Sequence, residues 1–221
     1  SCRFNTVNND NLSKVYSGTG TSQQTATISA WVKRCKTGND FQTIFAVGSD
    51  NFKLAFNSGS YSDAIQMYYY PGADTYRVGK DGSSASFDGY IAELNYIDGT
   101  AYEPSNFGLT DTSTGRWIPK SLTGLSYGTN GVRLQFGTSS AMGDDTSGNE
   151  NDFSPTGIDA TNQTTDSPTQ NHATLQGYPG ATLSEGNLKL VTGNSEQAHH
   201  NATLKPKSGK YYAEFTCNAM G

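Results

Sequence analysis

The fold is decided by the stretch Thr27-Ile28-Ser29-Ala30-Trp31-Val32-Lys33. It is rich in β-branched and aromatic residues, which are enriched in strands, and successive side chains of a strand point to opposite faces of a sheet. Ile28, Ala30 and Val32 therefore share one face, and Trp31 lies on the other. The stretch predicts a strand with an aliphatic face and with its tryptophan on the opposite face.

Short apolar runs of the same kind recur along the chain, each bounded by Gly, Asn, Asp or Ser, at residues 42–47, 52–56, 64–70, 87–99 and 132–136. Helical periodicity is nearly absent, so the chain is expected to be all-β. In the run 52–56, Phe52, Leu54 and Phe56 share one face. The long run 87–99 breaks the period of two, which predicts a bulge near Gly89.

The composition excludes several classes of protein. There are 15 basic and 20 acidic residues, and no basic run could neutralise phosphates, so no nucleic-acid partner is expected. No stretch of about 18 apolar residues exists, so no membrane insertion is expected. The 3 cysteines are far apart and include no Cys-x-x-Cys, which argues against a disulfide framework or a zinc site. The 13 Tyr and 10 Phe can fill a thin sandwich core.

The spacing of the runs suggests three parts. Residues 1–110 are expected to form a β-sandwich, and residues 111–172 a connector with one strand and a long polar loop. Residues 173–221 are expected to begin a second β-sandwich, with a strand at 210–216. Because that apolar strand would be an exposed edge, we expect the natural polypeptide to continue beyond it.

An ordered set of motifs carries a family resemblance: Arg3–Asn5, Asn11–Ser13, Thr27–Arg34, Phe45–Gly48, Phe87–Leu94, Ile97–Tyr102 and Pro104–Gly108. The order resembles the laminin G-like, concanavalin A-like domains of structural and tail-associated phage proteins. Residues 209–215 resemble the opening strand of a SPRY-like sandwich. The resemblance implies an antiparallel jelly-roll sandwich followed by the beginning of a second one.

The same resemblance implies a setting and a function. We expect a non-enzymatic virion surface protein, made in the host cytoplasm, that serves as a tail fibre, tail tip or capsid appendage in host attachment. The expected partners are other virion proteins and a lectin-like contact with host-surface glycan, with a homo-oligomer as a further expectation. The alternative is a structural cement or assembly module without a ligand, and the third reading is a carbohydrate-active enzyme.

Two departures from the family pattern concern the site. The segment between Tyr70 and Gly79 holds fewer strands than the family has there. The family's acidic pair after the Phe-x-Gly-x-Ile stretch is Ala92 and Glu93 here, so a metal site that uses the first carboxylate is not expected. Glycosidases need two facing carboxylates, whereas Glu93 stands alone, so no enzyme is expected.

A polar loop is the candidate metal site. Its expected calcium ligands are Asp144, Asp145, Ser147, Asn149, Asn151 and Asp152. Calcium takes six to eight oxygen ligands, and these side chains supply oxygens. The alternative is a set of ordinary Asx-turns, in which the same side chains bond their own backbone.

An aromatic run is the candidate carbohydrate site. Tyr68, Tyr70 and Tyr76 could stack on the faces of sugar rings. The alternative, core and edge packing of these rings, is favoured.

Overall fold

The computed structural model describes residues 1–6, 8–22, 24–36, 41–48, 52–56, 64–69, 75–82, 85–171, 173–175, 181–184, 187–192, 201–204 and 208–217. The paired strands in these residues run antiparallel, and the only helices described are short 3-10 turns. The all-β prediction is confirmed, whereas the jelly-roll order stays a prediction. Within the described part, no helix has the length and apolar character needed to cross a membrane.

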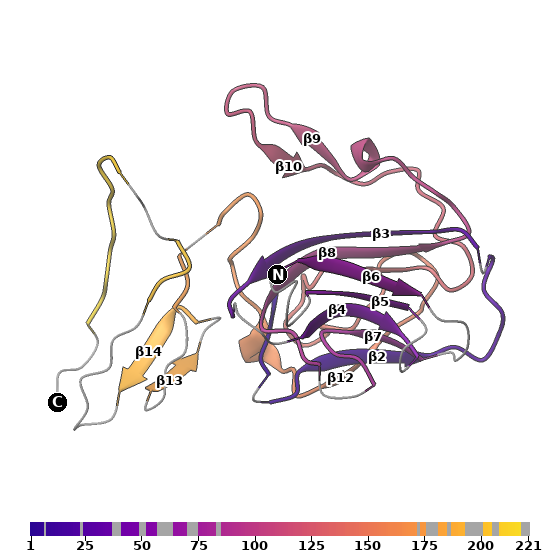
Figure 1. Ribbon diagram of the computed structural model, residues 1–221, viewed down its shortest axis with the longest axis horizontal. Coiled ribbons are helices and arrows are strands. Elements are labelled where there is room, and N and C mark those ends of the chain that lie inside the picture. The colour runs from indigo at the N-terminus through magenta and orange to yellow at the C-terminus, as the bar shows by residue number, and fades with distance from the viewer. Residues whose placement is uncertain are drawn as a thin grey trace.

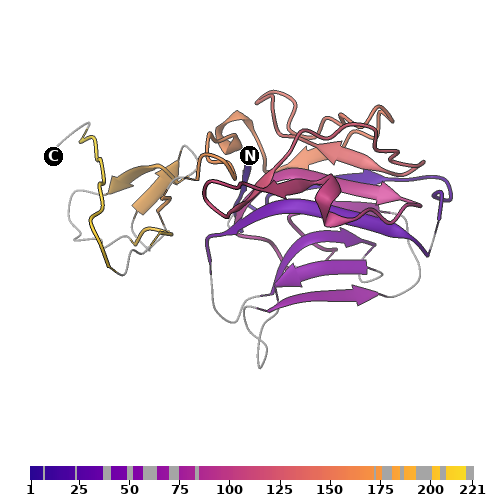
Figure 2. The same cartoon turned by 90° about the horizontal axis from the view of Figure 1, so that it is seen from above.

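Two sheets face each other across a shared core (Figure 1 and Figure 2). The first, called sheet A, centres on β8 (Gly89–Asp98). Along one edge of β8 lies β3 (Ala26–Arg34), and β1 (Cys2–Phe4) and β11 (Val132–Leu134) share the other edge. The second, called sheet B, has the strand order β12 (Ser154–Thr156), β2 (Asn11–Val15), β7 (Thr75–Val78), β4 (Gln42–Val47), β5 (Phe52–Phe56), β6 (Ile65–Tyr69).

The side chains predicted to share a face do so, and these faces lie toward the core. Ile28, Ala30 and Val32 of β3 pack against the buried cluster between the sheets. On β5, Phe52, Leu54 and Phe56 do the same, while Lys53 faces the other way and forms an ion pair with Asp81 at 2.6 Å. Both predictions of a shared face are therefore confirmed.

The bulge in β8 lies at Glu93, not near Gly89. Glu93 has a φ of 48°, and the pairing of β3 with β8 shifts register between Ser29 and Trp31. The extra residue lets Ile91 and Leu94 both reach the core, where each is fully buried. Gly89 has a different role: a Cβ there would lie 2.2 Å from the carbonyl oxygen of Lys33, so its missing side chain allows β3 to approach.

Residues 111–172 are part of the sandwich, which corrects their interpretation as a connector. They supply β11 to sheet A and β12 to sheet B. Their apolar side chains complete the core, with Val132, Leu134, Phe136, Met142 and Phe153 all buried in it. The segment just before β11 holds η2 (Pro104–Asn106) and the hairpin of β9 (Gly108–Thr110) and β10 (Trp117–Pro119), which lies outside the two sheets on the β3 side (Figure 1).

The C-terminal part lies beside the sandwich (Figure 2). It contains the hairpin of β13 (Ala181–Ser184) and β14 (Lys189–Thr192), and a bridge between Leu175 and Ala202. The strand predicted at 210–216 is not formed: residues 208–217 have no strand assignment and are exposed. A strand needs a neighbour to bond its backbone, and no described segment pairs with this one. A second sandwich stays a prediction.

Candidate functional site

The predicted calcium loop is organised by the carboxylate of Asp145. Its Oδ1 accepts hydrogen bonds from the backbone N–H groups of Arg133 at 2.9 Å and Ser147 at 2.8 Å. Its Oδ2 accepts from the Ser147 hydroxyl at 2.7 Å and the Asn151 N–H at 2.9 Å. Four donors thus occupy the oxygens that a calcium ion would need.

The remaining predicted ligands are used in the same way. Asn149 donates to the carbonyls of Gly128 and Gly131, and Asn151 donates to those of Thr129 and Gly131. Asp152 accepts from the Asp145 N–H at 2.9 Å, and Asp144 is exposed. Among the described residues, no group of three or more His, Cys, Asp and Glu side chains could hold a metal ion. The loop does not fit a calcium cage and matches the Asx-turn alternative.

The three predicted sugar-stacking tyrosines do not come together. Tyr76 lies in the core, with its ring centroid 4.6 Å from that of Tyr16, 5.3 Å from that of Tyr96 and 6.1 Å from that of Phe45. Tyr76 points between the sheets, so the favoured core packing is confirmed for this ring and its assignment as a sugar-stacking residue is wrong. Tyr68 pairs with Lys53 in the ladder between β5 and β6, and Tyr70 lies outside the described residues.

A different pocket lies on the outer face of sheet A. The strand register places Arg3, Tyr90 and Lys33 in one row across β1, β8 and β3, and Ala92 beside Trp31 in the next row. Alternation turns all of these side chains away from the core. Ala92 is the small member of its row, so a hollow opens over it between larger neighbours.

The other wall comes from residues 166–171, which follow η3 (Ala160–Asn162). Ser167 and Gln170 exchange two backbone hydrogen bonds of 3.1 Å, which close a tight turn containing Pro168. The resulting cavity has a volume of about 270 Å³. Its lining consists of Ser1, Trp31, Val32, Lys33, Tyr90, Ala92, Asp166, Ser167, Pro168 and Asn171.

The charged side chains of the pocket are paired. Lys33 Nζ lies 3.0 Å from Asp166 Oδ2, and the Asp166 side chain is only 4% exposed. Lys33 Nζ and Arg3 Cζ each lie 5.5 Å from the centroid of the Tyr90 ring, within the range of a cation–π contact. The site therefore combines an indole, a phenol ring, an ammonium group and a carboxylate in a small space.

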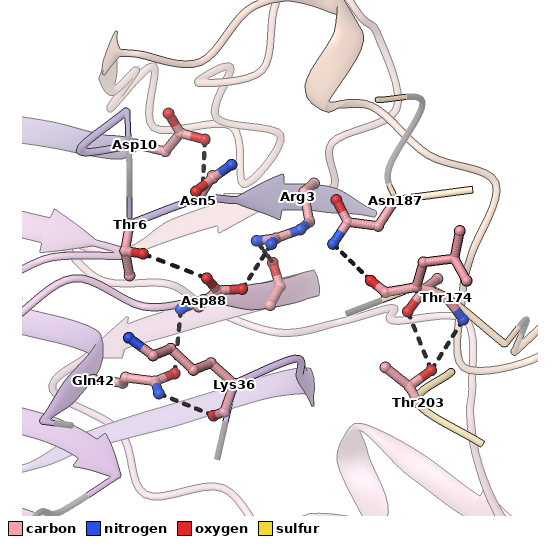
Figure 3. A network of polar contacts seen from close by, with 12 residues as sticks. Arg3, Asn5, Thr6, Asp10, Lys36, Gln42, Asp88, Thr174, Asn187 and Thr203 are labelled. Carbon is pink, nitrogen blue, oxygen red and sulfur yellow. Dashed lines mark hydrogen bonds and ion pairs between the residues drawn. The ribbon is translucent and has the colours of Figure 1, made fainter. Parts of the chain in front are cut away.

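A polar network fixes the Arg3 end of this row (Figure 3). Asp88 accepts from Arg3 at 2.6 Å and from Thr6 at 3.4 Å, and its own N–H donates to Gln42 at 3.2 Å. Gln42 in turn donates to the carbonyl of Lys36 at 3.0 Å. The network joins both sheets, so the guanidinium beside Tyr90 is held in place.

The hydroxyl of Tyr90 faces the C-terminal part. It hydrogen-bonds Thr174, and burial raises the pKa of Tyr90 above its ordinary value. Thr174 is fully buried and bonds Thr203 through both its backbone N–H and its hydroxyl (Figure 3). The phenol of Tyr90 is therefore kept protonated, and its hydrogen bond to Thr174 fixes its position in the pocket.

Sequence reasoning supplied only part of this site. Alternation placed Trp31 on the face opposite to Ile28, Ala30 and Val32, and the comparison with the family motif noted Ala92 at an acidic position. The sequence did not predict that Lys33 and Asp166 meet, since they lie 133 residues apart. No family model, curated protein or solved structure matches the chain, so the resemblance to phage laminin G-like domains stays a prediction.

Proposed function

We propose that the chain is a non-enzymatic glycan-binding sandwich of a virion surface protein, and that the pocket over Ala92 holds one sugar residue. The observation that carries the proposal is the Trp31 ring beside the Lys33–Asp166 pair. A pyranose has an apolar C–H face, which packs on an aromatic ring, and an edge of hydroxyls, which needs donors and acceptors. The pocket offers both within a volume that suits a single ring.

Binding without catalysis is supported by the carboxylates. The pocket lining contains one, Asp166, and Lys33 neutralises it. Glu93 is engaged elsewhere, with Arg133 Nη2 at 3.0 Å and Gln135 Nε2 at 3.2 Å. A glycosidase of the usual kind works with an acid and a second carboxylate across the bond that breaks. The viral setting is supported by the ordered motifs described above, and it gives the sugar a natural source in the host surface.

The proposal is tested with a glycan array and a matched pair of tryptophan variants. Trp31→Ala removes the stacking ring of the pocket, whereas Trp117→Ala removes the 46% exposed tryptophan of the β10 strand. We expect the wild-type chain and Trp117→Ala to bind the same glycans, and Trp31→Ala to lose binding by about tenfold or more. A folded wild-type chain that binds no glycan on the array would contradict the proposal.

One observation favours the alternative of an assembly module. Tyr211, Tyr212 and Phe215 are 65%, 86% and 87% exposed, which is unusual for aromatic side chains. Serine substitutions at these positions should then destabilise particles, whereas Trp31→Ala should reduce adsorption of intact particles. Purified particles that lack the protein would rule out both functions.

A further inference from the structure

We infer that the pocket over Ala92 takes an uncharged pyranose and rejects acidic and amino sugars. This inference rests on the proposed function and specifies its ligand. It is carried by the way in which each charged side chain at the pocket is already balanced by an opposite charge. The sugar must then be recognised through hydroxyl groups and its apolar face.

The first balanced pair is in the lining. Lys33 and Asp166 are 3.0 Å apart, with side chains 20% and 4% exposed, so each is largely removed from water and depends on the other. A sugar carboxylate could reach Lys33 only next to Asp166, where the two negative charges would repel. A protonated amino sugar could reach Asp166 only next to Lys33, where the two positive charges would repel. Either ligand would also lose hydration without gaining a free counter-charge.

The second balanced pair, Arg3 and Asp88, lies beside Tyr90, which lines the pocket. Arg3 bonds Asp88 at 2.6 Å, so the guanidinium over the Tyr90 ring is also compensated. The amino group of Ser1, at the edge of the pocket, donates to the carbonyl of Thr164 at 3.3 Å, and burial lowers its pKa, which reduces its positive charge near neutral pH. The charged side chains at the pocket therefore offer no excess of either sign to a charged ligand.

The pair suits neutral hydroxyls well. An ammonium group only donates hydrogen bonds and an ionised carboxylate only accepts them, while a hydroxyl does both. Two neighbouring hydroxyls of one ring can therefore accept from Lys33 and donate to Asp166 without breaking the ion pair. Trp31, on the adjacent row of the sheet, is placed to cover the ring's C–H face.

The experiment uses Trp31 as its own reporter. The chain has 2 tryptophans, so Trp117→Phe leaves Trp31 as the sole indole emitter. Its emission is titrated with the methyl glycosides of glucose, galactose and mannose, and with those of glucuronic acid, N-acetylneuraminic acid and glucosamine. For one ring in one pocket we expect a Kd on the order of 1 mM for at least one neutral glycoside.

Two features of the result identify the ligand class. The charged glycosides should bind at least about tenfold more weakly than the neutral one. The Kd of the neutral glycoside should change less than about twofold between about 50 mM and about 500 mM NaCl, because no net charge is paired on binding. Preferential binding of a charged glycoside, weakened by salt, would overturn the inference while leaving glycan binding intact. If none of the six binds to the folded chain, both the inference and the proposed function fail.

A charge variant provides a second test. Asp166→Asn removes the carboxylate that pairs with Lys33, so methyl glucuronide should gain affinity relative to the neutral glycoside by about tenfold. Asp111→Asn removes a charge from the exposed turn between β9 and β10 and should leave the preference unchanged. An unaltered preference in folded Asp166→Asn would show that the ion pair does not set the specificity.

Discussion

Single aspartates close many of the loops in this protein. Asp111 accepts from the Ser113 N–H and from the Ser113 and Thr114 hydroxyls, and these bonds lower its pKa to about 2. Asp159 caps η3 in the same way by accepting from Thr161. Asp145 repeats the pattern with Ser147. An Asp followed two residues later by Ser or Thr can thus finish a turn alone, which explains why a loop resembling a calcium site needs no ion.

The calcium loop gives a prediction at this scale. Asp145→Ala removes an acceptor of four hydrogen bonds and should destabilise the fold by about 2 kcal/mol, while Asp152→Ala removes an acceptor of one and should cost less. Thermal unfolding followed by circular dichroism checks both. The wild-type melting temperature should be the same in calcium and in chelator. A clear rise with calcium would restore the calcium hypothesis.

Asp10 gives a second residue-scale prediction, with an inverted pH dependence. It is fully buried, accepts from Asn5 and Asn162, and its burial raises the pKa to about 6 from the usual 3.8. Between these two values the folded chain keeps a proton that the unfolded chain has released. The contribution of Asp10 to the free energy of unfolding therefore falls as the pH rises from about 4 to about 6, by at most about 3 kcal/mol.

Urea denaturation over that pH range measures the effect. Asp10→Asn can still accept both hydrogen bonds but cannot release a proton, so its stability should lack this fall. Asp144→Asn, at an exposed position, is the control for loss of one negative charge. Parallel pH profiles for Asp10→Asn and the wild-type chain would show that Asp10 keeps an ordinary pKa.

At the scale of the elements, the sequence predicts the strands that alternate. The runs at β3, β4, β5 and β8 were expected because their apolar residues recur on one or both faces. The strands β1 and β12 have three residues each, and β12 is entirely exposed, so neither carries a period. They form because sheet edges need partners for their backbone groups, which is a property of the assembled sandwich.

The candidate site, too, could be predicted from the sequence only in part. Alternation alone predicts that Trp31 lies on the face opposite to Ile28, Ala30 and Val32. The hollow beside it depends on which residue of β8 lies opposite, and the bulge at Glu93 sets that register. A one-residue slip would turn the side chains of a strand to its other face, so local patterns could not place Ala92 next to Trp31.

The close contact of β3 with β8 is an element-scale prediction. A methyl group on Gly89 would lie 2.2 Å from the Lys33 carbonyl oxygen and 2.6 Å from the Phe87 ring, so Gly89→Ala should destabilise by about 3 kcal/mol or more. Gly18→Ala is the matched control, since nothing lies within 4 Å of a Cβ there. It should change the stability by less than about 1 kcal/mol. Equal urea midpoints for the two variants would contradict the tight approach.

At the scale of the whole molecule, the sandwich closes only late in the sequence. The N-terminal strand β1 bridges Gln163 through Cys2, and Ser1 exchanges backbone hydrogen bonds with Thr164. Asp10 is bound by Asn162, and β2 pairs with β12. Residues near 160 therefore hold the beginning of the chain in place. Residues 166–171, which form one wall of the pocket, follow directly. The polar composition that suggested a connector reflects loops that hydrogen-bond to one another between the few apolar residues that this segment adds to the core.

Limited digestion with chymotrypsin tests this organisation. Tyr211, Tyr212 and Phe215 are exposed and outside any strand, so the protease should cut there first. The core aromatics Phe136 and Phe153 are buried, at 4% and 3% exposure, and should be protected in the product. Intact mass spectrometry of the digest should show a resistant fragment that includes residues 1–171, because β11, β12 and the η3 segment are bonded to strands from the first hundred residues. A resistant fragment ending near residue 110 would instead mean that β11 and β12 leave the sheets easily. The pocket would then lose the wall formed by residues 166–171.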